Sequence, residues 1–294
     1  MKAILFGGTG FLGRAVARAL ASDGHTVESI ARTAPAGFHA ADVTEAKSLA
    51  GLKVDGDVAI NLAARIPTSA NTLSEHESMF DVNAVGAANV AQWAAARGIK
   101  RLVHCSTLVV ASRPWPVPLT EDAPTYPTGA VAAYAASKLA GELVAGSIAR
   151  AAGSSFVTLR LAALYGPGMV WVGVLPAFID AALSGKRLSA SSGAHADFLH
   201  VEDAAQAVVQ AVSADVTDAV NVASGAETSI VELARMVLTA CGRSAEDVDV
   251  TPSPISRAVV DITRLREQLG MRSQLPLAEG IAKLVRARPS KASP

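Results

Sequence analysis

Two side chains suited to proton transfer stand four residues apart in the sequence. Tyr134 and Lys138 lie within residues 132–152, an alanine-rich run with helical spacing, so both are expected on one face of a helix. A nearby ammonium stabilises a phenolate and lowers the pKa of a tyrosine from its usual value of about 10. The pair therefore predicts that Tyr134 is a general acid/base. Taken alone, the spacing also fits a partly buried tyrosine beside a solvated lysine.

A glycine-rich turn opens the chain. The apolar run Lys2-Ala3-Ile4-Leu5-Phe6 stops at glycines, and helical spacing begins after them, which predicts a buried strand, a tight turn and a helix N-terminus. The glycines at positions 7, 10 and 13 have the spacing of dinucleotide-binding turns, in which backbone N–H groups and the helix dipole favour a pyrophosphate. An ordinary strand-to-helix turn is the alternative interpretation of Gly7, Gly10 and Gly13.

The second expected strand, residues 26–32, ends without a carboxylate. A dinucleotide fold that prefers NAD usually places an acid there, to bind the adenosine ribose hydroxyls. This chain has Ala31 followed by Arg32. A guanidinium can pair with a 2′-phosphate, so NADP is the expected cofactor, with NAD as the alternative. Arg32 could equally be a solvated loop residue.

Strands and helices alternate over the first half of the chain, which predicts a doubly wound parallel sheet of the Rossmann type. Residues 1–164 are expected to form the dinucleotide-binding domain, with segments near 197–224 returning to its sheet. Residues 165–294 are expected to form a smaller C-terminal α/β substrate-binding domain. The strand expected at Arg101–Thr107 ends in hydroxyls, and the residues from Arg286 onward are expected to be a frayed tail.

Composition excludes several classes of function. The chain has 294 residues, with 26 Lys and Arg against 26 Asp and Glu, and no basic stripe suggests nucleic-acid binding. No apolar run is long enough to cross a bilayer, and a strand beginning at residue 2 leaves no room for a signal peptide. The two cysteines, Cys105 and Cys241, lack metal-ligand spacing. We therefore expect a cytoplasmic protein with no metal and a small-molecule substrate.

These motifs occur in an order that resembles the extended short-chain dehydrogenase/reductase family, the NAD(P)-dependent epimerase/dehydratase group. The resemblance covers nearly the whole chain. Its segments are Gly7-Gly8-Thr9-Gly10-Phe11-Leu12-Gly13, Asp42-Val43, Asn61-Leu62-Ala63-Ala64, Val82-Asn83-Ala84-Val85-Gly86, Ser106-Thr107, Tyr134 with Lys138, Tyr165-Gly166-Pro167-Gly168, Asp197-Phe198-Leu199-His200-Val201-Glu202-Asp203 and Asp261-Ile262-Thr263 through Leu269-Gly270.

The resemblance implies a role for each matching residue. Tyr134 would be the acid/base, Lys138 would bind the nicotinamide ribose and tune Tyr134, and Thr107 would hydrogen-bond the substrate oxygen. Asn83 would support this catalytic set. The residues implied in cofactor binding are Gly7, Gly10, Phe11, Leu12 and Gly13 in the turn, Asp42 and Val43 at the adenine, and Ala63 in the cofactor groove, besides Arg32, Tyr134 and Lys138.

Three departures bear on the substrate. Family members that act on nucleotide sugars usually carry an Asn where this chain has Ala163, an Arg where it has Ala196, and an Arg-x-Gly-Asp segment where it has Ser256-Arg257-Ala258-Val259. Loss of all three weakens the charge-assisted binding of a nucleotide diphosphate. The sequence therefore favours an oxidoreductase that interconverts a ketone and a secondary alcohol on a small non-nucleotide substrate.

Two other functions stay open. A nucleotide-sugar epimerase or ketosugar reductase is the alternative, with Arg187, Arg257 or His195 as replacement ligands of the diphosphate. Leu108-Val109 replaces the Asp-Glu of sugar 4,6-dehydratases, which argues against elimination. A non-catalytic dinucleotide-sensing module fits less well, because Thr107, Tyr134 and Lys138 are all present.

Two further expectations concern packing. Four aromatic residues are candidates for lining an apolar substrate pocket: Trp115, Trp171, Phe178 and Phe198. The alanine-rich helices expected at 79–97 and 132–152 would allow close helix–helix approach, and in this family such helices often form a dimer interface. A homodimer is therefore expected.

Overall fold

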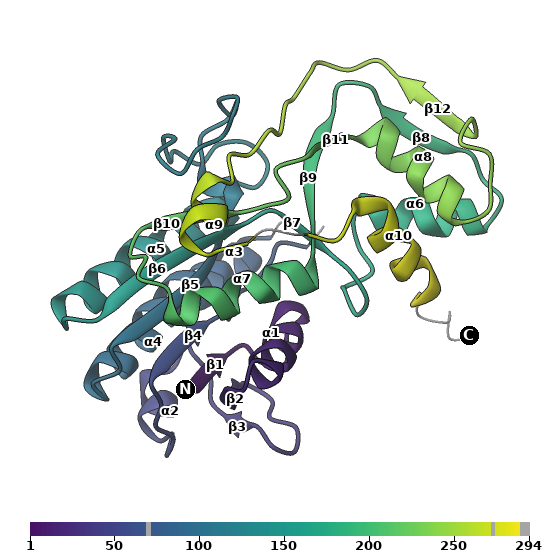
Figure 1. Ribbon diagram of the computed structural model, residues 1–294. Helices are drawn as coiled ribbons and strands as arrows, with labels where there is room; N and C mark the ends of the chain where they lie inside the picture. Colours follow the sequence, from purple (N-terminus) through teal and green to yellow (C-terminus); the bar gives the residue numbers. More distant parts are fainter. Residues whose placement is uncertain (69–71, 272–273, 289–294) are drawn as a thin grey trace.

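The computed structural model describes residues 1–68, 72–271 and 274–288, and its centre is a seven-stranded parallel sheet (Figure 1). The strand order is β10-β6-β5-β4-β1-β2-β3. The strands are β1 (Lys2–Phe6), β2 (Thr26–Ala31), β3 (His39–Ala40), β4 (Val58–Asn61), β5 (Arg101–Thr107), β6 (Ser155–Leu161) and β10 (Ala219–Val222). The doubly wound parallel sheet predicted from the sequence is confirmed.

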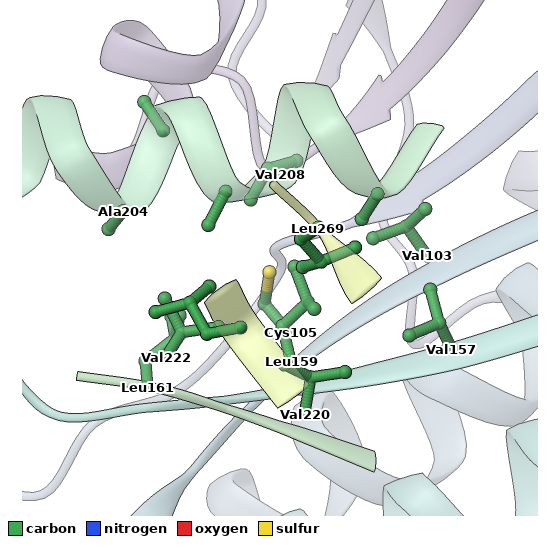
Figure 2. Packing of buried hydrophobic residues seen from close by; sticks show 14 of the residues in the cluster. Val103, Cys105, Val157, Leu159, Leu161, Ala204, Val208, Val220, Val222 and Leu269 are labelled. Carbon is green, nitrogen blue, oxygen red and sulfur yellow. The ribbon is translucent and has the colours of Figure 1, made fainter. Parts of the chain in front are cut away.

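Helices cover both faces of this sheet because neighbouring residues of a strand point to opposite sides. In β1, Ala3 and Leu5 join one buried cluster, whereas Ile4 and Phe6 join another. The first cluster lies under α1 (Phe11–Ser22) and α7 (Val201–Ser213), and the second under α2 (Ala46–Ala50), α4 (Gly86–Ala96) and α5 (Ala132–Ala151). Figure 2 shows side chains of the first cluster between α7 and the strands. Both faces of the strands are therefore removed from water, as their almost continuous apolar sequences require.

The helix expected over residues 79–97 is interrupted by a π-helical turn. It consists of α3 (Leu73–Phe80), the π turn Asp81–Val85 and α4. The carbonyl oxygen of Asn83, in this turn, lies so near α5 that a Cβ built on Gly141 would be 2.2 Å from it. A glycine at 141 is thus required for the close approach of α5 to the π turn.

The smaller region has two short sheets of its own. One contains β7 (Ala163–Tyr165), β9 (His195–His200) and β11 (Glu227–Ser229), and the other contains β8 (Leu188–Ser191) and β12 (Val248–Thr251). A third apolar cluster lies among α6 (Val174–Leu183), α8 (Ile230–Ala240), α10 (Leu277–Arg286) and these strands (Figure 1). The short helix α9 (Thr263–Gln268) packs beside β10.

The expectation that segments near 197–224 return to the main sheet is correct for only one of them. β10 pairs with β6 in parallel and forms the edge of the large sheet. β9 instead pairs with β7 in parallel and with β11 in antiparallel fashion. The sequence of a strand does not name its pairing partner, so this difference could not be predicted from residues 195–200 alone.

Among the helices of the described ranges, none combines bilayer-spanning length with a sufficiently apolar sequence. Residues 289–294, in which the sequence predicts a frayed tail, lie outside the described residues, and Arg286 itself ends α10.

Replacing Gly141 by alanine should destabilise the protein by about 1–3 kcal/mol, because the new methyl group would force backbone atoms of α5 and the π turn apart. Urea denaturation measures this loss. Gly51→Ala is the matched control, since a Cβ there would meet its nearest neighbour at 3.5 Å, an ordinary contact. Equal stability of both variants and the wild type would contradict the packing argument.

Candidate active site

The glycine-rich turn connects β1 to α1 and is tightly packed. Gly7 has a φ of +85°, and a Cβ on it would lie 2.8 Å from the backbone nitrogen of Ala63. A Cβ on Gly13 would lie 2.1 Å from the carbonyl oxygen of Gly7. Gly10 is exposed at the start of α1, and no side chain of the described residues caps this helix. The turn thus presents backbone N–H groups without side-chain obstruction, which fits the pyrophosphate of a dinucleotide.

The two apolar residues of the turn have a structural role. Phe11 and Leu12 begin α1, and their side chains pack against the first buried cluster. Any contribution of these two residues to cofactor binding therefore comes from their backbone.

The other predicted cofactor residues follow the carboxyl ends of successive strands. Arg32 comes directly after β2, Asp42 and Val43 after β3, and Ala63 after β4. Because the strands are parallel, these ends meet at one edge of the sheet, beside the glycine-rich turn. Thr107 ends β5 at the same edge.

Some residues at this edge are held by hydrogen bonds within the protein, whereas others are exposed to solvent. Asp42 Oδ1 accepts hydrogen bonds from the backbone nitrogen and the hydroxyl of Thr44, at 3.0 and 2.9 Å. The carbonyl of Val43 accepts one from Asn89 Nδ2 at 2.9 Å. Arg32 is exposed. The segment of Asp42 and Val43 is therefore held rigidly, whereas the Arg32 guanidinium can reach a ligand.

Thr107, Tyr134 and Lys138 come together between β5 and α5. The Thr107 hydroxyl lies close enough to the Tyr134 phenol to lower the pKa of Tyr134. Lys138 is buried, and its Nζ donates a hydrogen bond to the carbonyl oxygen of Cys105 at 2.7 Å. Tyr134 and Lys138, one turn apart on α5, thus face Thr107 and Cys105, which are two residues apart on β5. The structure brings the three predicted residues Thr107, Tyr134 and Lys138 together.

The predicted effect of Lys138 on the pKa of Tyr134 is not found in the structure. Burial raises the pKa of Tyr134 to about 12, and the Thr107 hydroxyl offsets only part of this rise. Burial also lowers the pKa of Lys138 to about 8. The expectation of a lowered tyrosine pKa was wrong, because desolvation of the phenolate outweighs the influence of an ammonium directed at a carbonyl.

Asn83 lies near the triad but serves to position it. Its Oδ1 accepts from the backbone nitrogen of Arg65 at 2.8 Å, and its Nδ2 donates to the Arg65 carbonyl at 3.0 Å and to Ser137 Oγ at 2.9 Å. Ser137 Oγ in turn donates to the carbonyl of Tyr134 at 2.8 Å. Asn83 therefore ties the segment after β4 to the first turns of α5, and Ser137 is a member of the site that sequence reasoning missed.

A cavity of about 190 Å³ opens beside Thr107. It is lined by Thr107, Leu108, Val109, Arg113, Trp115, Leu161, Ala162, Ala163, His195, Ala196, Asp197 and Ala258. A larger surface groove of about 360 Å³ involves α8 and α10, but Thr107, one of the predicted catalytic residues, lines the smaller cavity. We therefore take the smaller cavity as the substrate pocket.

Of the four aromatic residues predicted to line a pocket, the structure places only Trp115 there. Phe178 and Phe198 are buried in the third apolar cluster, and Trp171 packs against it. Scattered aromatic residues in a sequence do not reveal which of them face a cavity, because core packing is their more common use.

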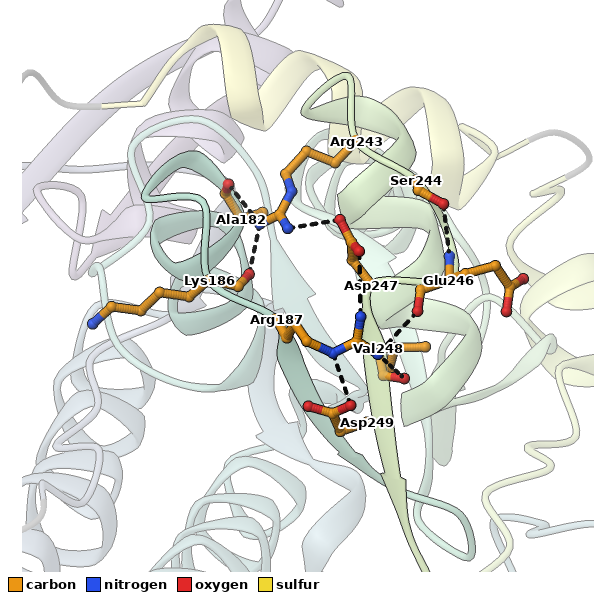
Figure 3. Close-up of polar contacts among 9 residues, drawn as sticks. All are labelled: Ala182, Lys186, Arg187, Arg243, Ser244, Glu246, Asp247, Val248 and Asp249. Atoms are coloured by element: carbon orange, nitrogen blue, oxygen red, sulfur yellow. Dashed lines mark hydrogen bonds and ion pairs between the residues drawn. The ribbon is translucent and has the colours of Figure 1, made fainter.

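The three residues expected to replace the missing diphosphate ligands do not lie together, and only one of them lines the pocket. His195 lines the pocket. Arg187 instead pairs with Asp247 and Asp249 near β8 and β12 (Figure 3). Arg257 Nε donates to both carboxylate oxygens of Glu227, at 2.9 and 2.7 Å. Arg113, by contrast, lines the pocket and was not predicted; the signal was its place in the proline-rich segment after Thr107.

Residues 3–223 match the sequence model of the NAD dependent epimerase/dehydratase family. This chain belongs to that family. A UDP-glucose 4-epimerase of Mycolicibacterium smegmatis is 31% identical over 312 residues, an alignment that covers 97% of each chain. The family predicted from the motifs is confirmed, and the chain is an enzyme of the extended short-chain dehydrogenase/reductase type.

Two further similarities extend over almost the whole chain. A 2-alkyl-3-oxoalkanoate reductase of Stenotrophomonas maltophilia is 27% identical over 297 residues, which cover 96% of this chain and 88% of the relative. The crystal structure of UDP-N-acetylglucosamine 4-epimerase from Bacillus cereus has a TM-score of 0.83 at 25% identity, covering 97% of this chain and 98% of that one.

Burial of Lys138 gives the site a measurable pH dependence. Because its pKa in the folded protein is about 8 and its ordinary value is 10.5, the unfolded chain binds more protons between these values. The free energy of unfolding should therefore rise with pH from 8 to 10, by up to ~1.4 kcal/mol per pH unit, relative to Lys138→Met. Urea denaturation of both proteins across this range measures the difference, and a difference that does not change with pH would contradict the assignment.

Proposed function

We propose that this enzyme exchanges a hydride between a nicotinamide dinucleotide and a secondary alcohol carbon of a nucleotide sugar, as a 4-epimerase or ketosugar reductase. The observation that carries the proposal is the position of Thr107, beside Tyr134, at the wall of a cavity on the same sheet edge as the glycine-rich turn. The sequence favoured a non-nucleotide substrate. The similarity to a UDP-glucose 4-epimerase over 97% of each chain supports the alternative instead.

Each residue of the proposed site has a separate role in the reaction. The dinucleotide, when bound, supplies the nicotinamide that accepts or donates hydride. The Thr107 hydroxyl hydrogen-bonds the reacting oxygen of the substrate, and Tyr134 takes the hydroxyl proton during oxidation and returns it during reduction. With a pKa of about 12, Tyr134 is a phenol at neutral pH and can donate its proton during reduction, whereas oxidation requires its phenolate as the proton acceptor. We expect Lys138 to bind the nicotinamide ribose, and its ammonium would stabilise the phenolate of Tyr134.

The cofactor site fits either dinucleotide, and we propose NADP as the preferred one. An exposed guanidinium at Arg32 supports binding of a 2′-phosphate, while the family description names NAD. A cytoplasmic location and a homodimer remain predictions of the sequence. Exposed apolar side chains at Val85 and Leu143, in the two segments expected to form the interface, support the dimer.

A second candidate function is reduction of a small 3-oxo acid. Alanines at positions 163, 196 and 258 line the pocket, and none of them can hydrogen-bond a diphosphate through its side chain. The similarity to a 2-alkyl-3-oxoalkanoate reductase supports this candidate independently.

Tyr134→Phe should lower kcat by about 10²–10⁴-fold, because the variant lacks the group that moves the proton. Conversion of UDP-glucose and of 3-oxohexanoate, with each dinucleotide, measures the loss. Binding of the dinucleotide should persist in the variant. Tyr126→Phe is the matched control, since Tyr126 is 76% exposed. Full activity of the Tyr134 variant would remove the proposed mechanism.

Arg32→Gln should weaken NADPH binding by roughly tenfold and leave NADH binding unchanged, because only NADPH carries the 2′-phosphate that a charged hydrogen bond would hold. Fluorescence titration of both proteins with both dinucleotides measures the affinities. A wild-type preference for NADH would show that the NADP proposal is wrong.

A further inference from the structure

Arg113 is held in a defined orientation at the wall of the substrate pocket. Its guanidinium carbon lies 4.0 Å from the ring centroid of Trp115, and both residues line the cavity with Thr107. The indole of Trp115 is itself held, because its Nε1 donates to the carbonyl of Ala111 at 3.4 Å and its ring packs against the first buried cluster. Stacking on an aromatic ring leaves the N–H edge of a guanidinium free to bind a planar oxyanion.

The charge of Arg113 is not paired with a carboxylate among the residues that the structure describes. Partial burial is the cause of the lowered pKa of its guanidinium. A guanidinium stays protonated in proteins, so the charge persists. Asp197 also lines the pocket, but its two carboxylate oxygens accept from the backbone nitrogens of Ser224 and Gly225, at 2.8 Å each.

Other arginines of the fold contrast with Arg113. Arg160 pairs with Glu142, Arg187 with two aspartates, Arg257 with Glu227 and Arg264 with Asp122. Each of these guanidinium groups already has an acidic partner. The unpaired positive charge at the pocket is thus a feature that a ligand would complete.

The size of the cavity limits where the anion can be. Pockets that enclose a drug-sized ligand measure roughly 300–1,000 Å³, whereas this one measures about 190 Å³. It can enclose the reacting part of a substrate and not a whole nucleotide sugar. An anion that meets Arg113 while the reacting oxygen meets Thr107 must therefore belong to the reacting part.

We propose that Arg113 binds a carboxylate carried by the substrate within a few bonds of the carbon at which hydride is exchanged. The inference rests on the proposed function and names its substrate class, an acid. The carboxylate belongs either to the uronic acid of a nucleotide sugar or to a short 3-oxo acid and its 3-hydroxy product. A charge-assisted contact of this kind changes affinity by roughly 10- to 100-fold.

Two pairs of ligands that differ in the carboxylate test the proposal. Calorimetry in the presence of saturating NADP gives dissociation constants for UDP-glucuronate against UDP-glucose, and for 3-hydroxyhexanoate against its methyl ester. In the wild type, the acid of at least one pair should bind at least tenfold more tightly than its neutral partner. The pair that shows the preference identifies the source of the carboxylate.

Variants then test whether Arg113 is the residue that causes the tighter binding of the acid. Arg113→Gln should abolish it while leaving the affinity for the neutral partner unchanged, and Arg113→Lys should keep part of it. Arg187→Gln is the matched control, because Arg187 pairs with Asp247 and Asp249 away from the pocket, and it should behave as the wild type.

Three results would overturn the proposal. These are no preference for the acid in either pair, a preference that survives in Arg113→Gln, and an equal loss of affinity for both UDP-sugars in that variant, which would place the diphosphate at Arg113. The measurements need no turnover. A failure of the proposed function, seen as no conversion by the wild type, is therefore distinguishable from a failure of this inference.

Discussion

A buried ammonium determines how the site is assembled. Lys138 is 2% exposed, and its Nζ donates to the carbonyl oxygen of Cys105 in β5. A charge removed from water is costly unless polar partners surround it, so α5 can pack only in a register that brings Lys138 to this carbonyl. The same register brings Tyr134 to Thr107, two residues further along the strand. One turn beyond Lys138, Glu142 pairs with Arg160 of β6 at 2.9 Å, which attaches the same helix to the neighbouring strand.

Close packing on the other side of α5 supports this arrangement. Gly141 allows the π turn to approach, and Asn83 in that turn binds both the backbone of Arg65 and the hydroxyl of Ser137. The segment after β4, which holds Ala63 at the cofactor edge, is thus connected to the helix that carries the acid/base. Hydrogen bonds and close glycine contacts therefore join the predicted cofactor edge to the helix that carries Tyr134.

The substrate pocket depends on the second, smaller sheet. β9 carries His195, Ala196 and Asp197 across from Thr107. Its position is held where Asp197 accepts the backbone N–H groups of Ser224 and Gly225, just after β10. Because β10 belongs to the main sheet and β9 to the small one, this carboxylate joins the two halves of the site. The pocket is therefore built from parts of the chain that are distant in sequence: residues 107–115, which include Arg113 and Trp115, residues 161–163, residues 195–197 and Ala258.

The sequence by itself determined the parallel sheet, the glycine-rich turn, the triad and the family, because each depends on local periodicity or on residues at short fixed spacings. It could not show that Trp115 faces the pocket while Phe178 and Phe198 lie in a core, since an aromatic ring suits both places. It also could not separate Arg113, which has no acidic partner among the described residues, from Arg187 and Arg257, which have them. Only the tertiary structure decided the sheet of β9, the partner of each charge and the direction of the pKa shift of Tyr134. The burial of a side chain and the pairing of a charge depend on contacts with residues distant in the chain. They therefore cannot be predicted from the spacing of residues along the sequence.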